Sequence, residues 1–524
     1  MRIIHFTIIS AILLDIFAVL SFFSPTCFAK NFYLRSQDDC GYNPGDGRSY
    51  NCGQAWNKHS DIIWDSGDGI GVGPGDTLWI IGEIRDGREF DYNKQYSLFE
   101  IPIDGKEHLP VTIHGGHFIK PGVIVGGLVE TLYNFKRLNN NVFELADIGN
   151  AQNIHAVVIG DAEADWPLHS LCQLTPVENE EQVFKIPGSF KVVGDKLLLN
   201  RGECLGNDVV YKPQGALFLN GHDYITVRDL NLFFGRDYAP LTTMKKKKYT
   251  KDDINIGLHV KNCTIAFGTG KPGIAGLHGS QNCTIEGNKF VNVTSAMYWV
   301  TYKNLPTVHG LIVRNNEIYC RTSNNYFLPR RNAKDAHAIG GQGVCNKCLI
   351  EKNYIHDFYG DGILLYFNQP YEYAEDTIIR WNRIENLDED NLGFDDDQGI
   401  EGSEGKPYWN NGIMLFGTNR DMSISKDNIP GWKIYGNVFK NIDQDIEGKQ
   451  DSTNGSAINI KWSRPDNVKD VIRIFGNYVD GARHGVVIRE IEHKGVSYAS
   501  GNVQENYFRN IVQNIIWARG VQEN

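Results

Sequence analysis

The sequence lacks several features that would point to other protein classes. After the first 29 residues, no apolar run approaches the roughly 18 residues of a membrane-spanning helix. Basic residues are in deficit, because 52 Lys and Arg face 63 Asp and Glu, and a formal charge of −11 argues against nucleic acid as a partner. Cys345 and Cys348 form a CxxC pair with no second such pair, so we expect no zinc site. We also expect no organic cofactor.

The composition is that of a folded, turn-rich β protein. The sequence has 10 Trp, 24 Tyr and 26 Phe, which is too many aromatic residues for a disordered chain. It also has 55 Gly and 5 Met. Many glycines together with many aromatic residues are typical of short strands joined by turns.

Residues 1–29 have the pattern of a signal peptide. Arg2 precedes an apolar run over 3–23, and a short segment ending in Ala29 resembles a cleavage site. Asp15 interrupts the apolar run, and the alternative is an N-terminal membrane anchor. We expect cleavage after Ala29, a secreted or periplasmic protein, and no membrane contact after cleavage.

Because the protein is expected to be exported, its cysteines should lie in an oxidising compartment, where disulfides can form. Of 10 cysteines, Cys27 lies in the signal segment, so an odd number remains and at least one stays unbridged. Two candidate bridges are Cys40–Cys52, which would close a Gly-rich loop, and Cys172–Cys204. The other cysteines include Cys263, Cys283 and Cys348, which begin similar phrases and predict either buried thiols or a Cys263–Cys283 bridge.

One phrase recurs from Cys283 onward at variable spacing. In each copy an aliphatic residue is followed three positions later by Asn, and two positions after that by another apolar residue. A fixed phrase with variable spacing indicates a constant coil that carries loops of different length. We expect these Asn residues to be structural and to hydrogen-bond along a stack. The seven are Asn288, Asn316, Asn353, Asn382, Asn437, Asn477 and Asn506.

A second strand phrase follows the first in most coils. Examples are the segments 337–342, 361–366, 411–416 and 484–489. Two strand phrases per coil, separated by loops, predict an all-β parallel β-helix in which each coil buries its apolar face by stacking on its neighbours.

The pattern resembles the right-handed parallel β-helix proteins of the pectate-lyase-like superfamily. The segments 31–35 and 72–80 are similar to the N-terminal cap and first strand of that superfamily, and 225–232 is similar to an early coil with Leu230 in the Asn position. The resemblance implies an N-terminal cap and first coils over 30–130, an antiparallel β insert over 131–212, and the β-helix proper over 213–524.

Stacking the second phrase on itself predicts a polar row on one face. His337 and Asp361 should be neighbours on consecutive coils, with Gln342 and Tyr366 one strand length away. Asp335 adds a carboxylate close to His337, and two glycines between His337 and Gln342 suggest close approach of a ligand. The alternative is structural, with His337 at a chain turn and Asp361 in an Asp-Gly turn. The same alignment puts Asn411 and His484 in the row of His337, together with Gly455.

A second candidate cluster is basic. Lys461 lies one coil before His484, Arg489 and Glu490, in a segment rich in Lys and Arg. These side chains could bind uronate carboxylates, or they could be ordinary solvated strand edges. The superfamily resemblance suggests that such rows line a groove for a polysaccharide.

A third candidate cluster is acidic. The segment 385–404 holds many carboxylates and no Lys or Arg. Dense carboxylates repel each other unless a cation neutralises them, so calcium is a candidate cofactor and a solvated loop is the alternative. The tentative ligands are Asp388, Asp390, Asp395, Asp397 and Glu401.

Two reactions fit a polysaccharide groove, and a third hypothesis is non-catalytic. In a β-eliminating lyase, which we favour, His337 or Lys461 would be the base, Tyr366 the proton donor, and Arg489, Gln342 or Ca²⁺ the neutraliser of the uronate carboxylate. A hydrolase would instead use two carboxyl groups, such as Asp361 with Asp335 or Asp395 with Asp397. The third hypothesis is a glycan-binding or adhesin β-helix.

Family motifs do not decide between these hypotheses. The pectin-cleaving β-helix hydrolases carry paired Asp residues, Gly-His-Gly and Arg-x-Lys. This chain has the partial matches 396–397, 483–485 and 489–491, without the Lys. The Asp-Pro-His motif of the mannuronan epimerases is absent from the sequence.

Overall fold

The structure is a computed structural model of the whole chain. It describes residues 29–519 apart from the segments 37–39, 42, 66–69, 85–98, 149–153, 155–156, 161–171, 205, 212–214, 236–238, 245–253, 269–271, 303–304, 321–336, 344, 359, 368–375, 388–409, 418–431, 443–454, 463–471 and 491–502. Residues 1–28, the greater part of the expected signal peptide, lie outside this description. In the described part of the chain, no helix has the length and apolar character needed to cross a membrane.

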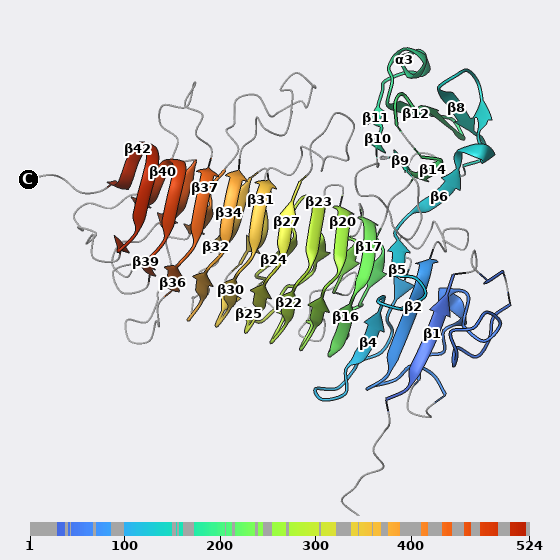
Figure 1. Ribbon diagram of the computed structural model, residues 1–524, viewed down its shortest axis with the longest axis horizontal. Coiled ribbons are helices and arrows are strands. Elements are labelled where there is room, and N and C mark those ends of the chain that lie inside the picture. The colour runs from blue at the N-terminus through green and yellow to red at the C-terminus, as the bar shows by residue number, and fades with distance from the viewer. Residues whose placement is uncertain are drawn as a thin grey trace, which may run out of the picture.

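The chain winds into a right-handed parallel β-helix, which confirms the predicted fold class (Figure 1). Its 31-stranded parallel sheet runs through three rows of strands. The first row comprises β1 (Asn31–Arg35), the start of β2 (Thr77–Ile84), β4 (Val111–His114), β16 (Ile225–Arg228), β19 (His259–Lys261), β22 (Thr284–Glu286), β26 (Ile312–Arg314), β30 (Leu349–Glu351), β33 (Ile378–Arg380), β36 (Trp432–Tyr435), β39 (Ile472–Phe475) and β41 (Val503–Gln504).

The second and third rows complete each coil. The second row comprises the end of β2, β5 (Gly122–Val125), β17 (Leu230–Gly235), β20 (Thr264–Gly268), β23 (Lys289–Val293), β27 (Glu317–Tyr319), β31 (Tyr354–Phe358), β34 (Arg383–Leu387), β37 (Val438–Ile442), and the first halves of β40 (Tyr478–Glu490) and β42 (Tyr507–Arg519). The third row comprises β3 (Phe99–Glu100), β15 (Leu217–Phe218), β18 (Leu241–Thr242), β21 (Ile274–Ala275), β24 (Met297–Val300), β28 (His337–Gln342), β32 (Asp361–Phe367), β35 (Ile413–Gly417), β38 (Ser456–Trp462), and the second halves of β40 and β42. A two-stranded pair, β25 (Val308–His309) with β29 (Cys345–Asn346), lies outside the rows.

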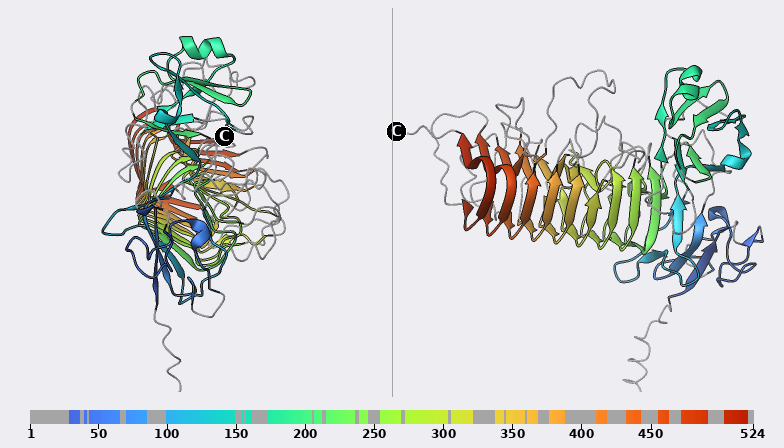
Figure 2. Two further views of the ribbon diagram at one scale, coloured as in Figure 1. Left: turned by 90° about the vertical axis from the view of Figure 1, so that its right-hand side faces the viewer. Right: turned by 45° about the horizontal axis from the view of Figure 1, so that its top comes forward.

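Alternation along the strands fills the interior. In β26 the flanking residues are partly exposed and Val313 is buried, and β19 and β33 bury Val260 and Ile379 in the same way. These residues belong to one core cluster that runs from Phe32 to Val486. Figure 2 shows the coils stacked on one another along the solenoid. Their buried residues belong to the same cluster, so the buried face of one coil is completed by its neighbours.

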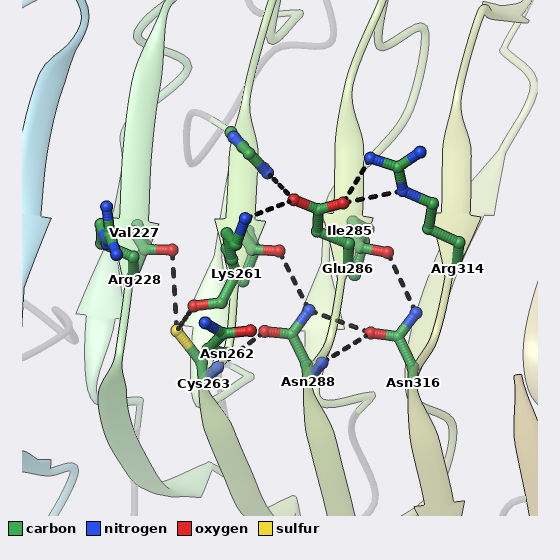
Figure 3. A network of polar contacts seen from close by, with 12 residues as sticks. Val227, Arg228, Lys261, Asn262, Cys263, Ile285, Glu286, Asn288, Arg314 and Asn316 are labelled. Carbon is green, nitrogen blue, oxygen red and sulfur yellow. Dashed lines mark hydrogen bonds and ion pairs between the residues drawn. The ribbon is translucent and has the colours of Figure 1, made fainter.

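The Asn ladder predicted from the repeat is confirmed (Figure 3). Asn316 donates from its backbone N and its Nδ2 to Oδ1 of Asn353, at 3.1 and 2.9 Å, and Nδ2 also donates to the carbonyl of Ile285 at 3.0 Å. Each side-chain amide thus hydrogen-bonds to backbone groups at a corner of the coil, which would otherwise be buried and unpaired. The same pattern runs from Asn288 to Asn506.

The ladder begins at Cys263, which corrects the expected cysteine register. Cys263 donates its backbone N to Oδ1 of Asn288 at 2.9 Å, so it occupies the Asn position, as Leu230 does one coil earlier. Cys283 precedes a first-row strand instead, so Cys263 and Cys283 are not equivalent and both remain buried thiols.

Two disulfides join Cys40 to Cys52 and Cys345 to Cys348. The first was expected from the sequence. The second uses the CxxC pair, which the sequence analysis left unbridged. Cys172 and Cys204 form no disulfide, and both are buried as thiols. A hydrogen bond with Cys172 and burial raise the pKa of the Cys204 thiol.

The N-terminal coil is covered by the loop that the first disulfide closes. Trp56 follows this loop, and its ring stacks on Phe32 of β1 with centroids 5.5 Å apart. The short 3-10 helix η1 (His59–Asp61) follows.

The insert leaves the solenoid after β5 and returns before β15 (Figure 1). It has its own core, which includes Leu174 and Val209. Val158 and Val210 pack against Phe233 and Phe267 of the second row. One sheet has the order β10 (Cys172–Gln173), β9 (Val157–Gly160), β14 (Asp208–Tyr211), β6 (Leu128–Thr131), and the other has β11 (Thr175–Pro176), β12 (Ser189–Val193), β13 (Lys196–Asn200), β8 (Val142–Leu145), β7 (Lys136–Arg137), with α3 (Glu180–Lys185) and η3 (Leu132–Asn134) alongside.

Candidate active site

The predicted polar row lies at the corner where third-row strands begin. His337 pairs in register with Asp361, as expected. Asn411 follows Asp361, because Gly362 donates its backbone N to the Asn411 carbonyl at 2.8 Å. The next members are Ser456 and His484, which also pair in register. Ser456 therefore takes the place that the sequence alignment gave to Gly455.

Within this corner row, the side chains of His337 and Asp361 are buried and lie close together. His337 is 3% exposed and Asp361 is fully buried at 0%. Nδ1 of His337 lies 3.4 Å from Oδ2 of Asp361, and within the described residues neither atom has a hydrogen bond. Oδ1 of Asp361 accepts from the backbone N and Nδ2 of Asn411 at 2.9 and 2.8 Å. A carboxylate buried this deeply needs such partners.

The polar contacts continue along the same corner. Asn411 Oδ1 accepts from Nδ2 of Asn459 at 3.0 Å and from the backbone N of Ser456 at 3.4 Å. His484 and its neighbour Arg483 are buried as well. This set of contacts is suited to holding the strand starts in place. The catalytic and binding roles of His337, Asp361, Asn411 and His484 remain predictions.

The two glycines after His337 serve strand packing. A Cβ on Gly340 would lie 2.0 Å from the Leu364 carbonyl oxygen, and one on Gly341 would lie 1.9 Å from the Trp299 carbonyl oxygen. Neighbouring strands therefore occupy the space that the sequence analysis had reserved for a ligand.

A second row, which we call the outer row, lies farther along the same strands. Tyr366 pairs with Phe416, and Phe416 pairs with Lys461. Lys461 pairs with Arg489, which pairs with Arg519. The sequence analysis placed Lys461 one coil before Arg489, and the register pairs the two residues directly.

Along each of these strands, the outer-row residue directly follows a residue whose side chain points into the core. Leu365, Leu415 and Ile460, which precede its members, belong to the core cluster. Tyr366 is partly exposed. Gln342 follows Gly341, the partner of Leu365, and so falls in register with Tyr366. For Gln342, Lys461, Arg489 and Glu490 the structure describes only the backbone register.

Several predicted residues fall outside the described residues. They are Asp335 and the tentative calcium ligands Asp388, Asp390, Asp395, Asp397 and Glu401. In the part of the chain that is described, no group of three or more His, Cys, Asp or Glu side chains is placed to hold a metal ion. Calcium remains an expectation from the sequence.

Sequence reasoning missed an ion network on the first row (Figure 3). Glu286 contacts Nζ of Lys261 at 3.0 Å, Nε2 of His259 at 3.1 Å and a terminal guanidinium nitrogen of Arg314 at 2.6 Å. Burial raises the pKa of Glu286, but hydrogen bonds from Lys261 and Arg314 outweigh it and lower the pKa to about 2. Lys, Glu and Arg at the same phrase position of successive coils were the available signal.

Thus the strand registers define a parallel β-helix protein, the architecture that the sequence resemblance implied. No family model and no curated protein matches the chain. Among solved structures, the complex of XylC with xylose is 11% identical, with 94% of this chain and 86% of that chain covered and a TM-score of 0.47. A glycoside hydrolase is 10% identical, with 94% and 98% covered and a TM-score of 0.46. An alginate lyase from Paenibacillus sp. str. FPU-7 is 11% identical, with 86% and 93% covered and a TM-score of 0.33.

Proposed function

We propose that the protein is a secreted carbohydrate-active enzyme that cleaves an anionic, uronate-containing polysaccharide by β-elimination at the outer row. The observation that carries this proposal is the direct register of Lys461, Arg489 and Arg519 on three consecutive coils. Like charges facing each other on neighbouring strands are unfavourable, and a bound anion between them removes that cost. The row thus suits a chain of carboxylated sugars.

The residue types of the outer row match the needs of the reaction. Arg489 would neutralise the uronate carboxylate, which makes the adjacent C5 proton more acidic. Lys461 would take that proton, the C5 electron pair would form the C4=C5 bond, and the C4–O bond would break. Tyr366, two strands from Lys461 and so about 10 Å along the axis, would donate its proton to the leaving oxygen.

We assign the role of the base to Lys461 rather than to His337. His337 is buried against Asp361 at the start of its strand, whereas Lys461 lies in the outer row beside Arg489. A base must come within hydrogen-bond reach of the proton that it removes. In this scheme the corner row positions the strands, and the outer row contacts the sugar.

Asp361 is a poor candidate for paired-carboxylate hydrolysis, because it is fully buried. A secreted location rests on the signal-like segment 1–29, together with the disulfides Cys40–Cys52 and Cys345–Cys348, which suit an oxidising compartment.

The test is a panel of anionic and neutral polysaccharides, with calcium and with chelator. Ultraviolet absorbance of the unsaturated uronate and new reducing ends are followed in parallel. We expect both signals to rise on a uronate polymer. New reducing ends without ultraviolet absorbance would indicate a hydrolase. No change in either signal with any polysaccharide of the panel would favour the adhesin hypothesis.

The matched variants are Lys461→Ala and Lys440→Ala. Lys440 lies on the second row, away from the outer row. Loss of the base should lower kcat by about 10²–10⁴-fold, while Lys440→Ala stays close to wild type. Equal activity of the two variants would show that Lys461 is not the base.

A further inference from the structure

One outward-facing position of the first-row strands forms one continuous line along the solenoid. It runs in register from Tyr33 on β1, through Lys261 on β19 and Arg380 on β33, to Phe475 on β39. We call this line the first-row stripe. It belongs to a different row of strands from the outer row that we propose for catalysis.

One end of the stripe is aromatic. Tyr33, Tyr50, Trp79, His117 and Phe118 form the N-terminal cluster. Their rings contact one another, with centroid distances of 5.9 Å for Tyr33–Tyr50, 5.6 Å for Trp79–His117 and 5.7 Å for Tyr50–Phe118. Phe118 is 81% exposed and Tyr50 is 37% exposed. An exposed group of aromatic rings on a soluble protein marks a binding surface.

The histidine of this cluster acts as a neutral ring near pH 7. Burial, followed by the charge of Arg35, lowers the pKa of His117. Its ring lies 4.4 Å from that of Phe118 and 6.0 Å from that of Tyr33. The cluster therefore offers uncharged ring faces and edges, which suit the apolar C–H faces of a sugar ring.

The middle of the stripe is charged but internally compensated. Glu286 is held by Lys261 and Arg314, and Glu351 by Arg380 at 2.7 Å. These carboxylates have cationic partners and do not present bare negative charge to an anionic ligand. Arg380 also donates to the hydroxyl of Tyr435 at 2.9 Å.

The far end combines rings with a pair of exposed cations. Lys433 and Arg473 pair in register on β36 and β39, both are exposed, and among the described residues neither has an ion-pair partner. The rings of Tyr435 and Phe475 stack beside them at 4.8 Å. Trp381 is 46% exposed one coil earlier. We call Trp381, Tyr435, Phe475, Lys433 and Arg473 the C-terminal cluster.

We propose that the first-row stripe is a second polysaccharide-binding surface, which holds an anionic glycan chain along the solenoid axis between the N-terminal and C-terminal clusters. Charge complementarity supports an anionic ligand. Along the described first-row strands the acidic residues are Glu286 and Glu351, and Asp229, directly after β16, pairs with Arg228 at 2.8 Å. They are outnumbered by Arg35, Arg228, Lys261, Arg314, Arg380, Lys433 and Arg473, although the whole chain has a formal charge of −11.

A glycan fits this surface better than a nucleic acid does. Stacking rings and cations also bind single-stranded nucleic acid. However, the chain has a formal charge of −11, which argues against nucleic acid as a partner, so we commit to a glycan. The choice of a uronate polymer rests on the proposed function, whereas the existence of the surface does not.

The experiment measures binding without turnover. The whole chain carries Lys461→Ala, and affinity electrophoresis is run in gels with polygalacturonate, alginate, hyaluronan or neutral xylan, with labelled dT20 in a parallel binding assay. Phe118→Ala tests the N-terminal cluster, and Lys433→Ala/Arg473→Ala tests the C-terminal one. The matched control is Tyr507→Ala/Arg509→Ala on β42, which also removes an exposed ring and an exposed cation. Because all of these side chains are exposed, their thermal midpoints should match that of the parent.

We expect each cluster variant to bind the preferred anionic polymer at least about tenfold more weakly, and the control to bind it unchanged. In the active background, kcat/KM should fall for the polymer and not for short oligosaccharides. Cluster variants that bind like the control would overturn the proposal, as would a preference for xylan or dT20. The wild type could cleave no polymer while the cluster variants still weaken binding. That result would support the binding surface and contradict the proposed enzymatic function.

Discussion

At the scale of single residues, buried polar groups hold this protein in register. The Asn ladder and the corner row both place amide and carboxylate groups at turns between strands, where backbone groups would otherwise lack partners. Each Asn side chain of the ladder contacts the Asn of the next coil. A single substitution therefore disturbs two coils at once.

Asn353→Ala tests the ladder. It removes the acceptor of Asn316 and the donor to the Val313 carbonyl, and both partners are buried. We expect a loss of about 2–4 kcal/mol in the free energy of unfolding, measured by urea denaturation. Asn506→Ala, at the partly buried end of the ladder, should cost less. Equal losses would show that ladder position does not matter.

Glu286 should make the protein sensitive to acid. Its pKa is about 2 in the folded state against an ordinary 4.5, so its stabilisation is present above about pH 4.5 and is lost as the pH falls toward 2. The urea midpoint of Glu286→Gln should therefore lie below wild type at pH 7, and the gap should close between those pH values. Glu317→Gln, a more exposed carboxylate, is the control. A gap that is independent of pH would contradict this assignment.

Residue-level prediction from the sequence succeeded where a phrase repeats and failed where it does not. The pairing of His337 with Asp361 followed from the phrase alone. Ser456 was placed one residue off, because the small interior residue of that coil is Ala457 and not Ser456. The first-row stripe was missed, because its charges appear singly in the sequence and converge only after stacking.

At the scale of elements, strands of the solenoid are short and the loops between them vary. The repeat made the strands predictable, since each copy buries the same positions. Loop contacts have no such period, and the two halves of β40 follow each other without a loop where earlier coils have long ones. The antiparallel insert was expected as an interruption of the phrase, but its docking on Phe233 and Phe267 left no pattern in the sequence.

The insert should be removable. A Cβ placed on Gly126 would lie 2.5 Å from the backbone of Gly215, so the chain leaves and returns at one point. Joining Gly126 to Gly215 by a short Gly-Ser linker should keep the β-sheet circular dichroism of the solenoid. The variant should also bind an apolar dye, because Phe233 and Phe267 lose their cover. Substituting both by Thr should abolish the dye signal. Loss of the β-sheet signal would show instead that the solenoid needs the insert.

At the scale of the whole molecule, the structure contains a solenoid core and an insert core, which meet at a further apolar cluster around Phe233 and Phe267. One runs the length of the solenoid and the other fills the insert. The insert core is smaller than the solenoid core. Each inner coil of the solenoid, in contrast, packs against a coil on either side. We expect the two units to differ in stability.

The reactivity of buried thiols in denaturant can measure this difference in stability between the solenoid and the insert. Cys283 and Cys320 lie in the solenoid, and Cys172 and Cys204 lie in the insert. Burial raises the pKa of Cys283 to about 12, so it should not react with a thiol reagent while folded. In rising urea, mass-spectrometric labelling should modify Cys172 and Cys204 first. Simultaneous labelling of all four would show a single cooperative unit.

The stacking of coils also fixes a length scale. Strand spacing is about 4.8 Å whether a coil carries a short turn or a long loop. Side chains in the first-row stripe and in the outer row are therefore spaced at a constant interval along the axis. The sugars of a polysaccharide repeat at an interval of their own. Where the two periods differ, successive sugars fall out of phase with successive side chains. Affinity should then rise with chain length only over the stretch in which ligand and protein stay commensurate, and the best ligand is the one whose repeat matches the solenoid.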